Sequence, residues 1–175
     1  MPPWQIVRHL WGFRDLIRQL VKRELGQRYQ GSYLGFLWSF IVPLLMLLIY
    51  TFVFSVIFKS RWATTTEEAR LGEFALTLFA GLAPFSVFSE VVNRAPNLIL
   101  GVPNYVKKVV FPLEILPVVV LCASLFNSLI SVGILLLGSL IFLGFISPAV
   151  VWLPLAYVPL ALLCLGLGWL LASLG

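Results

Sequence analysis

The last 61 residues of the chain, 115–175, contain no Asp, Glu, Lys, Arg or His. A helix needs about 20 apolar residues to cross the hydrocarbon core of a bilayer, so this run must hold at least two crossings. Strands of a membrane barrel would alternate apolar and polar residues over about 10 positions, and this run does not alternate. The sequence therefore predicts an all-α integral membrane protein.

Four transmembrane helices are expected. The first uncharged block, 32–58, holds 27 residues, which is roughly 40 Å of helix and enough to cross a bilayer with some tilt. Further apolar blocks lie at 74–92, 113–144 and 149–174. Only 11% of the residues are charged, against about 25% in soluble domains. Residues 32–175 are thus predicted to form one transmembrane domain.

Residues 10–25 have the pattern of an amphipathic helix. At about 100° per residue, Leu10, Phe13 and Leu16 fall on one face, together with three further apolar residues. A basic amphipathic helix beside a span lies in the headgroup layer, in contact with membrane lipids. We expect 1–31 to be a cytoplasmic segment with such an interface helix, and a plain membrane anchor is the alternative. The basic residues of its polar face are Arg14, Arg18, Lys22 and Arg23.

The charges of the connecting segments predict the orientation. The N-terminal segment has six basic and two acidic residues from Arg8 to Arg28, whereas the segment 59–73 has three of each. The segment 93–111 has three basic residues and no acidic one. Because positive charge stays on the cytoplasmic side, the N-terminus and 93–111 are expected inside and 59–73 outside. The net charge of +5 flanks apolar spans, so it does not indicate a nucleic-acid partner.

The segment 93–111 is too short and too interrupted, by Gly101 and Pro103, to cross the membrane. A basic cytoplasmic segment between two spans is well placed to dock a soluble partner. Interfacial re-entry of the chain without a partner is the alternative.

Few polar residues lie within the spans. Glu90, near the inner end of the second span, is either a functional acid or the partner of Arg94 in a solvated ion pair. The third span carries Ser124, Asn127, Ser128 and Ser131 at helical spacing, which is typical of helix packing. Its length suggests a tilt, a bend at Pro117 or a projection beyond the bilayer.

Catalytic chemistry is not indicated. The single histidine, His9, leaves no metal-binding pair, and no glycine-rich phosphate loop is present. Glu67 and Glu68 are adjacent in an expected loop and are better explained as solvated charges than as an acid–base pair. Cys122 and Cys164 lie in apolar spans, where a disulfide is not expected. A membrane-embedded glycosyl- or acyltransferase would need clustered Asp, His or Glu, which 115–175 lacks.

Two motifs carry a family resemblance. The first is Arg28-Tyr29-x-x-Ser32-x-Leu34-Gly35-x-Leu37-Trp38, followed by Pro43. The second is Gly81-Leu82-x-Pro84-x-x-x-Phe88, then Asn97, then Asn104-x-Val106-Lys107-Lys108-Val109-x-Phe111-Pro112-x-Glu114-Ile115-Leu116-Pro117. Together they resemble the type-2 ABC exporter permeases that move lipid-linked polysaccharides, such as O-antigen, capsule and teichoic acid, out of bacteria. The resemblance covers nearly the whole chain.

The resemblance implies a subunit of the bacterial inner membrane that has no cofactor or catalytic residue of its own. Its partners would be a second permease copy and an ABC ATP-binding subunit that holds ATP and Mg. The segment 93–111 would be the coupling loop to that subunit. Since the family usually has six spans, this chain is expected to be truncated. Expected contacts to the ATP-binding subunit are Arg94, Asn97, Asn104, Lys107 and Lys108.

A glycan path between the two copies is also implied by the resemblance. Aromatic rings offer flat faces to sugar C–H groups, and the first span carries many of them. The alternative is that these rings face lipid or pack against other helices. Two other functions stay open, a type-2 permease for a drug or small amphiphile and a non-transporting membrane anchor. The candidates for the glycan path are Tyr33, Phe36, Phe40, Tyr50, Phe54 and Phe58.

Overall fold

The computed structural model describes residues 10–29, 35–53, 67–98, 112–146 and 148–174, and the regular secondary structure in these ranges is helical. This confirms the expected all-α class. The short 3-10 segments are η1 (Gly35–Leu37), η3 (Ala95–Asn97) and η4 (Pro148–Trp152). The α-helices are α2 (Arg14–Tyr29), α3 (Trp38–Phe52), α4 (Glu67–Arg94), α6 (Ile115–Leu143) and α7 (Leu153–Leu174).

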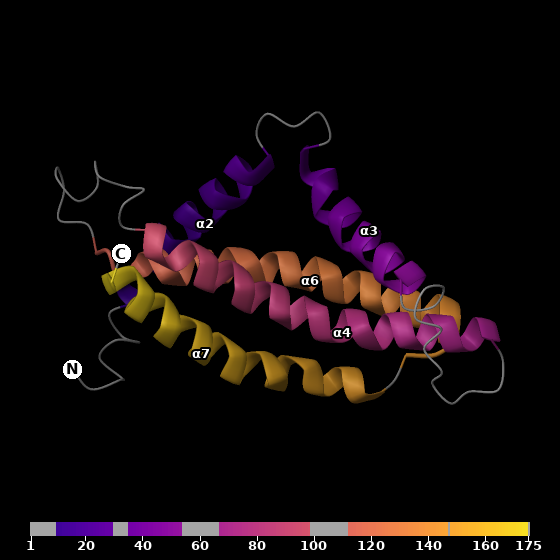
Figure 1. Ribbon diagram of the computed structural model, residues 1–175. Helices are drawn as coiled ribbons and strands as arrows, with labels where there is room; N and C mark the ends of the chain where they lie inside the picture. Colours follow the sequence, from indigo (N-terminus) through magenta and orange to yellow (C-terminus); the bar gives the residue numbers. More distant parts are fainter. Residues whose placement is uncertain (1–9, 30–34, 54–66, 99–111, 147, 175) are drawn as a thin grey trace.

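Three long helices, α4, α6 and α7, lie side by side (Figure 1). On the side away from α7, α2 and α3 form an inverted V over them (Figure 1). The lower part of α2 packs against α6, and α3 contacts both α4 and α6. The C-terminal end of α4, the first turn of α6 and the last turn of α7 share one end of the bundle (Figure 1).

The long helices have the length and hydropathy of membrane spans. In the described part of the chain, the span-length apolar segments are Leu76–Asn97, Ile115–Ile141 and Val150–Leu174. Many of their exposed side chains are large and apolar: Ile141 is 77% and Val151 is 79% exposed. Such a surface suits contact with lipid tails rather than water. The expected spans 74–92, 113–144 and 149–174 therefore have counterparts in the structure.

The first expected span, 32–58, is described only from Gly35 to Val53. Within it α3 has 15 residues, which is about 22 Å of helix and less than the hydrocarbon thickness. Pro43 lies inside α3 without ending it. Residues 54–58 lie outside the described part, so the full length of this span stays a prediction.

The core is formed where α4, α6 and α7 meet. Val87 and Val91 of α4 pack with Val120 and Leu121 of α6 and with Cys164 of α7, and all five are buried. Small residues let these helices approach closely. A Cβ atom on Gly168 would lie 3.2 Å from the Cβ of Pro117 and 3.5 Å from a methyl group of Val91. Gly168 is therefore one of the points at which α7 closely approaches both other helices.

Two helix limits differ from the expected ones. α4 begins at Glu67, within the segment 59–73 that was expected to be a loop. Strong helix formers such as Ala69 and Leu71 extend the helix beyond its apolar block, and acidic residues are favoured at a helix N-terminus. α2 ends at Tyr29 rather than near Leu25.

Pro117 does not bend α6. It occupies the third position of that helix, in the first turn, where a missing N–H removes no helical hydrogen bond. At the other end, Gly144 adopts φ +74° and its N–H donates to the carbonyl of Leu140 at 3.2 Å. This left-handed conformation, which glycine adopts without strain, terminates α6.

Candidate functional site

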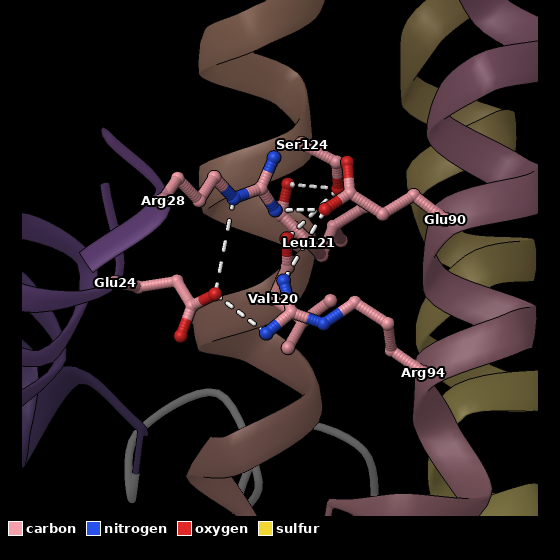
Figure 2. Close-up of polar contacts among 7 residues, drawn as sticks. All are labelled: Glu24, Arg28, Glu90, Arg94, Val120, Leu121 and Ser124. Carbon is pink, nitrogen blue, oxygen red and sulfur yellow. Dashed lines mark hydrogen bonds and ion pairs between the residues drawn. The ribbon is translucent and has the colours of Figure 1, made fainter. Parts of the chain in front are cut away.

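Four charged side chains from two helices meet across the face of α6 (Figure 2). Glu24 and Arg28 come from α2, and Glu90 and Arg94 come from α4. Within each pair the residues are four positions apart, a spacing that places both side chains on one helix face. We call these four residues the charge network.

Each carboxylate in the charge network faces both guanidinium groups. Arg28 donates to Glu90, and Arg94 Nη1 lies 3.3 Å from the same Glu90 oxygen. Arg94 Nη2 lies 2.5 Å from Glu24 Oε1, which is also 3.8 Å from Arg28 Nε. Two contacts therefore join α2 to α4 and two lie within a helix. The formal charges of the network cancel.

The charge network is largely removed from solvent. The exposed fractions are 18% for the Arg28 side chain, 20% for Glu24, 24% for Glu90 and 37% for Arg94. A charged group near a membrane span is costly unless it is paired. Mutual pairing therefore allows these four charges to lie between helices, and it makes the position of α2 depend on that of α4.

On the face of α6 beneath the network, the Ser124 hydroxyl already has a hydrogen-bond partner. Val120 and Ser124 are each 2% exposed, and the Ser124 hydroxyl donates to the Val120 carbonyl at 2.8 Å (Figure 2). Ser124 therefore keeps its hydrogen bond within α6. The network lies over this face of α6, and two of its ion pairs join α2 to α4 (Figure 2).

A cavity of about 630 Å³ adjoins the network and lies between α3, α4 and α6. Arg28 and Glu90 belong to its wall, and Trp38, Phe79 and Phe85 supply aromatic surface. Its size falls in the usual range for small-molecule sites. Among the described residues no group of three or more His, Cys, Asp or Glu is placed to hold a metal ion. Its other polar wall residues are Ser39, Tyr50, Ser86, Ser89, Asn127 and Ser131.

Ser39 differs from the other serines of the cavity. It is 9% exposed, and its hydroxyl has no hydrogen-bond partner among the described residues. By contrast, the Ser86 hydroxyl donates to the Ala83 carbonyl at 2.7 Å. A buried hydroxyl without a partner is unfavourable. The cavity therefore offers one polar group that a bound molecule could satisfy.

The polar residues of the third span have different surroundings. Ser124 and Ser128 are buried between helices, as the packing interpretation predicts, and the Ser128 and Tyr157 hydroxyls are 2.6 Å apart. Asn127 and Ser131 instead line the cavity. Glu90 does pair with Arg94, and it also pairs with Arg28.

The expected contacts to an ATP-binding subunit are only partly described. Arg94 belongs to the charge network, and Asn97 is exposed in η3. Asn104, Lys107 and Lys108 lie outside the described residues. The basic residues of the expected interface helix are all exposed on α2; these are Arg14, Arg18, Lys22 and Arg23.

The expected glycan-path residues fall into three groups. Phe40 is 41% exposed on α3, whereas Tyr50 is half-buried and lines the cavity. The side chains of Tyr33, Phe36, Phe54 and Phe58 lie outside the described part. Their role in a path therefore stays a prediction.

Sequence analysis missed Glu24, and it used Arg28 only as part of a motif. The available signal was a repeated Glu-x-x-x-Arg pattern, at 24/28 and at 90/94, next to two different spans. Helical spacing predicts a pair within each segment. It does not predict that the two pairs meet, since that depends on how α2 packs.

Comparisons with known proteins bear on most of the chain. The sequence profile of the family described as ABC-2 type transporter matches residues 15–175. An O-antigen export system permease protein, RfbA of Myxococcus xanthus, is 35% identical over 132 residues, which is 75% of this chain and 47% of that protein. Two proteins of the same name from Klebsiella pneumoniae are 33% and 32% identical over 103 residues, 59% of this chain and 36% of each protein. The chain thus spans less than half the length of these relatives.

Proposed function

This chain belongs to the ABC-2 type transporter family, and on that basis we propose that it is the membrane-spanning permease part of an ATP-driven exporter for lipid-linked polysaccharide. The relatives are named O-antigen export permeases, which supports a glycan as the substrate class. The multi-pass helical structure supports a location in a membrane, proposed here as the bacterial inner membrane with the N-terminus in the cytoplasm.

The structural observation that carries the proposal is the charge network. It joins α2 to the last turn of α4, and the end of α4 together with η3 forms the start of the segment 93–111. A force applied by a soluble subunit at that segment would reach α4 directly and α2 through the ion pairs. Such a permease needs two discrete packings of its helices rather than a catalytic site.

ATP and Mg are assigned to a separate ATP-binding subunit, and no cofactor is assigned to this chain. Two permease copies would enclose the glycan path, with aromatic residues of the first span as candidate lining. Contact with the ATP-binding subunit is assigned to five polar residues of 93–111, which are Arg94, Asn97, Asn104, Lys107 and Lys108.

The test is ATPase stimulation in a reconstituted complex with the cognate ATP-binding subunit. Lys107→Glu combined with Lys108→Glu should return the ATPase rate to that of the isolated subunit, because an acidic pair would repel the docking surface. The matched control is Lys59→Glu with Arg61→Glu, in the segment expected on the outer side, and it should keep full stimulation. Unchanged stimulation in the Lys107/Lys108 variant would contradict the assigned contact.

A second candidate is a type-2 permease for a drug or small amphiphile, and the size of the cavity favours it. ATPase stimulation by small amphiphiles, but not by a lipid-linked glycan, would select this candidate. Copurification of an ATPase that never responds to this chain would instead indicate a non-transporting anchor.

A further inference from the structure

We propose that the cavity between α3, α4 and α6 binds the neutral sugar headgroup of a single-chain glycolipid within one copy of the chain. The inference rests on the proposed function and adds to it a binding site inside a protomer, separate from a path between two copies. The cavity adjoins the charge network at one end and reaches Tyr50 of α3 at the other. Along α3, from Trp38 to Tyr50, this is roughly 18 Å of helix.

The polar lining suits hydroxyl groups. Serine hydroxyls and the Asn127 amide can both donate and accept hydrogen bonds, as sugar hydroxyls can. Ser39 adds the decisive observation, since its buried hydroxyl has no partner among the described residues. A sugar hydroxyl placed beside Ser39 would remove that deficit. A purely hydrocarbon occupant would leave it in place.

The apolar lining suits the rest of such a molecule. Trp38, Phe79 and Phe85 give flat surfaces on which the C–H face of a sugar ring can pack. Val42 and Met46 of α3 are 47% exposed, and Phe85 of α4 is 59% exposed. These half-exposed side chains form the outer edge of the cavity, where an alkyl chain can continue into surrounding lipid. The cavity therefore combines a mostly apolar lining with a few polar groups.

The charges at the cavity end favour a neutral headgroup. Arg28 and Glu90 both line the cavity, but they are paired with each other. A phosphate would have to compete with the Glu90 carboxylate for Arg28, whereas a neutral sugar leaves the pair intact. The network thus closes one end of the site without giving it a net charge.

The experiment uses the purified full chain in nanodiscs of zwitterionic lipid. The probe is octyl β-glucoside with a diazirine on its alkyl chain, and labelled peptides are identified by mass spectrometry. Saturable labelling of α3 and α4 should be displaced by octyl β-glucoside and not by octanol at equal concentration. Displacement by free glucose would support the proposal further, because the sugar alone would then be sufficient for binding to the cavity. Equal displacement by octanol would overturn the proposal, because the site would then bind alkyl chains without recognising the sugar.

Variants locate the site. Ser39→Leu removes the hydroxyl and fills the cavity, so probe affinity should fall more than tenfold, whereas Ser39→Ala should lower it about fivefold. The control is Ser173→Leu, which replaces an exposed serine of α7 that bonds within its own helix and should leave affinity unchanged. Should Ser39→Leu not fold, the probe affinities of Ser39→Ala and Ser131→Leu test whether the probe binds in the cavity. Affinity equal to that of the control in these variants would overturn the proposal.

The ATPase assay separates this inference from the proposed function. If stimulation by this chain is normal but the probe shows no saturable site, only the cavity assignment fails. If the probe binds as expected but no ATPase couples to the chain, the exporter assignment fails and the sugar site remains.

Discussion

At the scale of single residues, the charge network explains how four ionised side chains are tolerated between helices. Each arginine has a carboxylate on its own helix and another on the neighbouring helix. Removing one member therefore takes an ion pair from two residues of like charge, whereas loss of one residue of an exposed ion pair affects a single partner. The network should thus be much more sensitive to substitution than an exposed ion pair.

Glu90→Gln should destabilise the protein by about 1–3 kcal/mol, less than for a fully buried pair because the side chain is 24% exposed. The loss arises because Arg28 and Arg94 share the Glu90 oxygen. Thermal unfolding in detergent measures it, with Glu114→Gln, an exposed glutamate, as the control. Equal unfolding temperatures for the two variants would show that the network does not form.

Exchange of the charges tests the contact between helices directly. Arg28→Glu alone places three acidic groups around Arg94, so it should lower the unfolding temperature more than Glu90→Gln does. Adding Glu90→Arg restores opposite charges between α2 and α4 and should recover most of the loss. A double variant whose destabilisation equals the sum of the two single ones would count against pairing of Arg28 with Glu90.

The residue scale also shows where sequence prediction stops. The pairing of Glu90 with Arg94 follows from their spacing on one helix. Arg28 and Glu90 are 62 positions apart, so their contact follows from the packing of α2 and cannot be deduced from helical periodicity. Likewise, Ser128 and Ser131 look equivalent in the sequence, but one bonds with Tyr157 and the other lines the cavity.

At the scale of helices, the sequence predicted α6 closely because apolar blocks of helix length can be read from the sequence. The block 113–144 corresponds to α6 at Ile115–Leu143. The start of α4 was placed too late, since polar residues with high helix propensity continue the helix beyond its apolar part. Apolar blocks do not predict the contacts between helices, such as the close approach of α7 to α4 and α6 at Gly168.

Gly168→Leu should separate α7 from the core, because even a Cβ atom there would approach Pro117 to 3.2 Å. We expect a loss of about 1–3 kcal/mol from overpacking, seen as a lower unfolding temperature. Gly166 is the matched control on the same helix. A Cβ atom there meets nothing within 4 Å, so Gly166→Leu should leave the unfolding temperature unchanged or higher.

The opposite order of the two glycine variants would contradict the packing of α7. Equal effects at both positions would do the same, because the loss would then come from helix composition. Either result would show that Gly168 is not a point of close contact between α7 and the core.

At the scale of the whole molecule, the helices form a bundle, and the charge network and the cavity lie on the same side of it. The charge network and the cavity both lie where α2 and α3 face α4 and α6, whereas α7 presents exposed apolar side chains. The end of α4 and the start of α6 lie together at one end of the bundle (Figure 1). A soluble subunit acting at 93–111 would therefore move two adjacent helices at once.

Coupling to an ATP-binding subunit requires that 93–111 faces the cytoplasm, where that subunit can reach it. The most direct measurement is labelling of Lys107→Cys by a membrane-impermeant maleimide in intact spheroplasts, with Cys122 and Cys164 replaced by alanine. Ser60→Cys, in the segment expected outside, is the matched control. We expect Ser60→Cys to be labelled at once and Lys107→Cys to be labelled only after permeabilisation. Labelling of Lys107→Cys in intact spheroplasts would contradict this orientation.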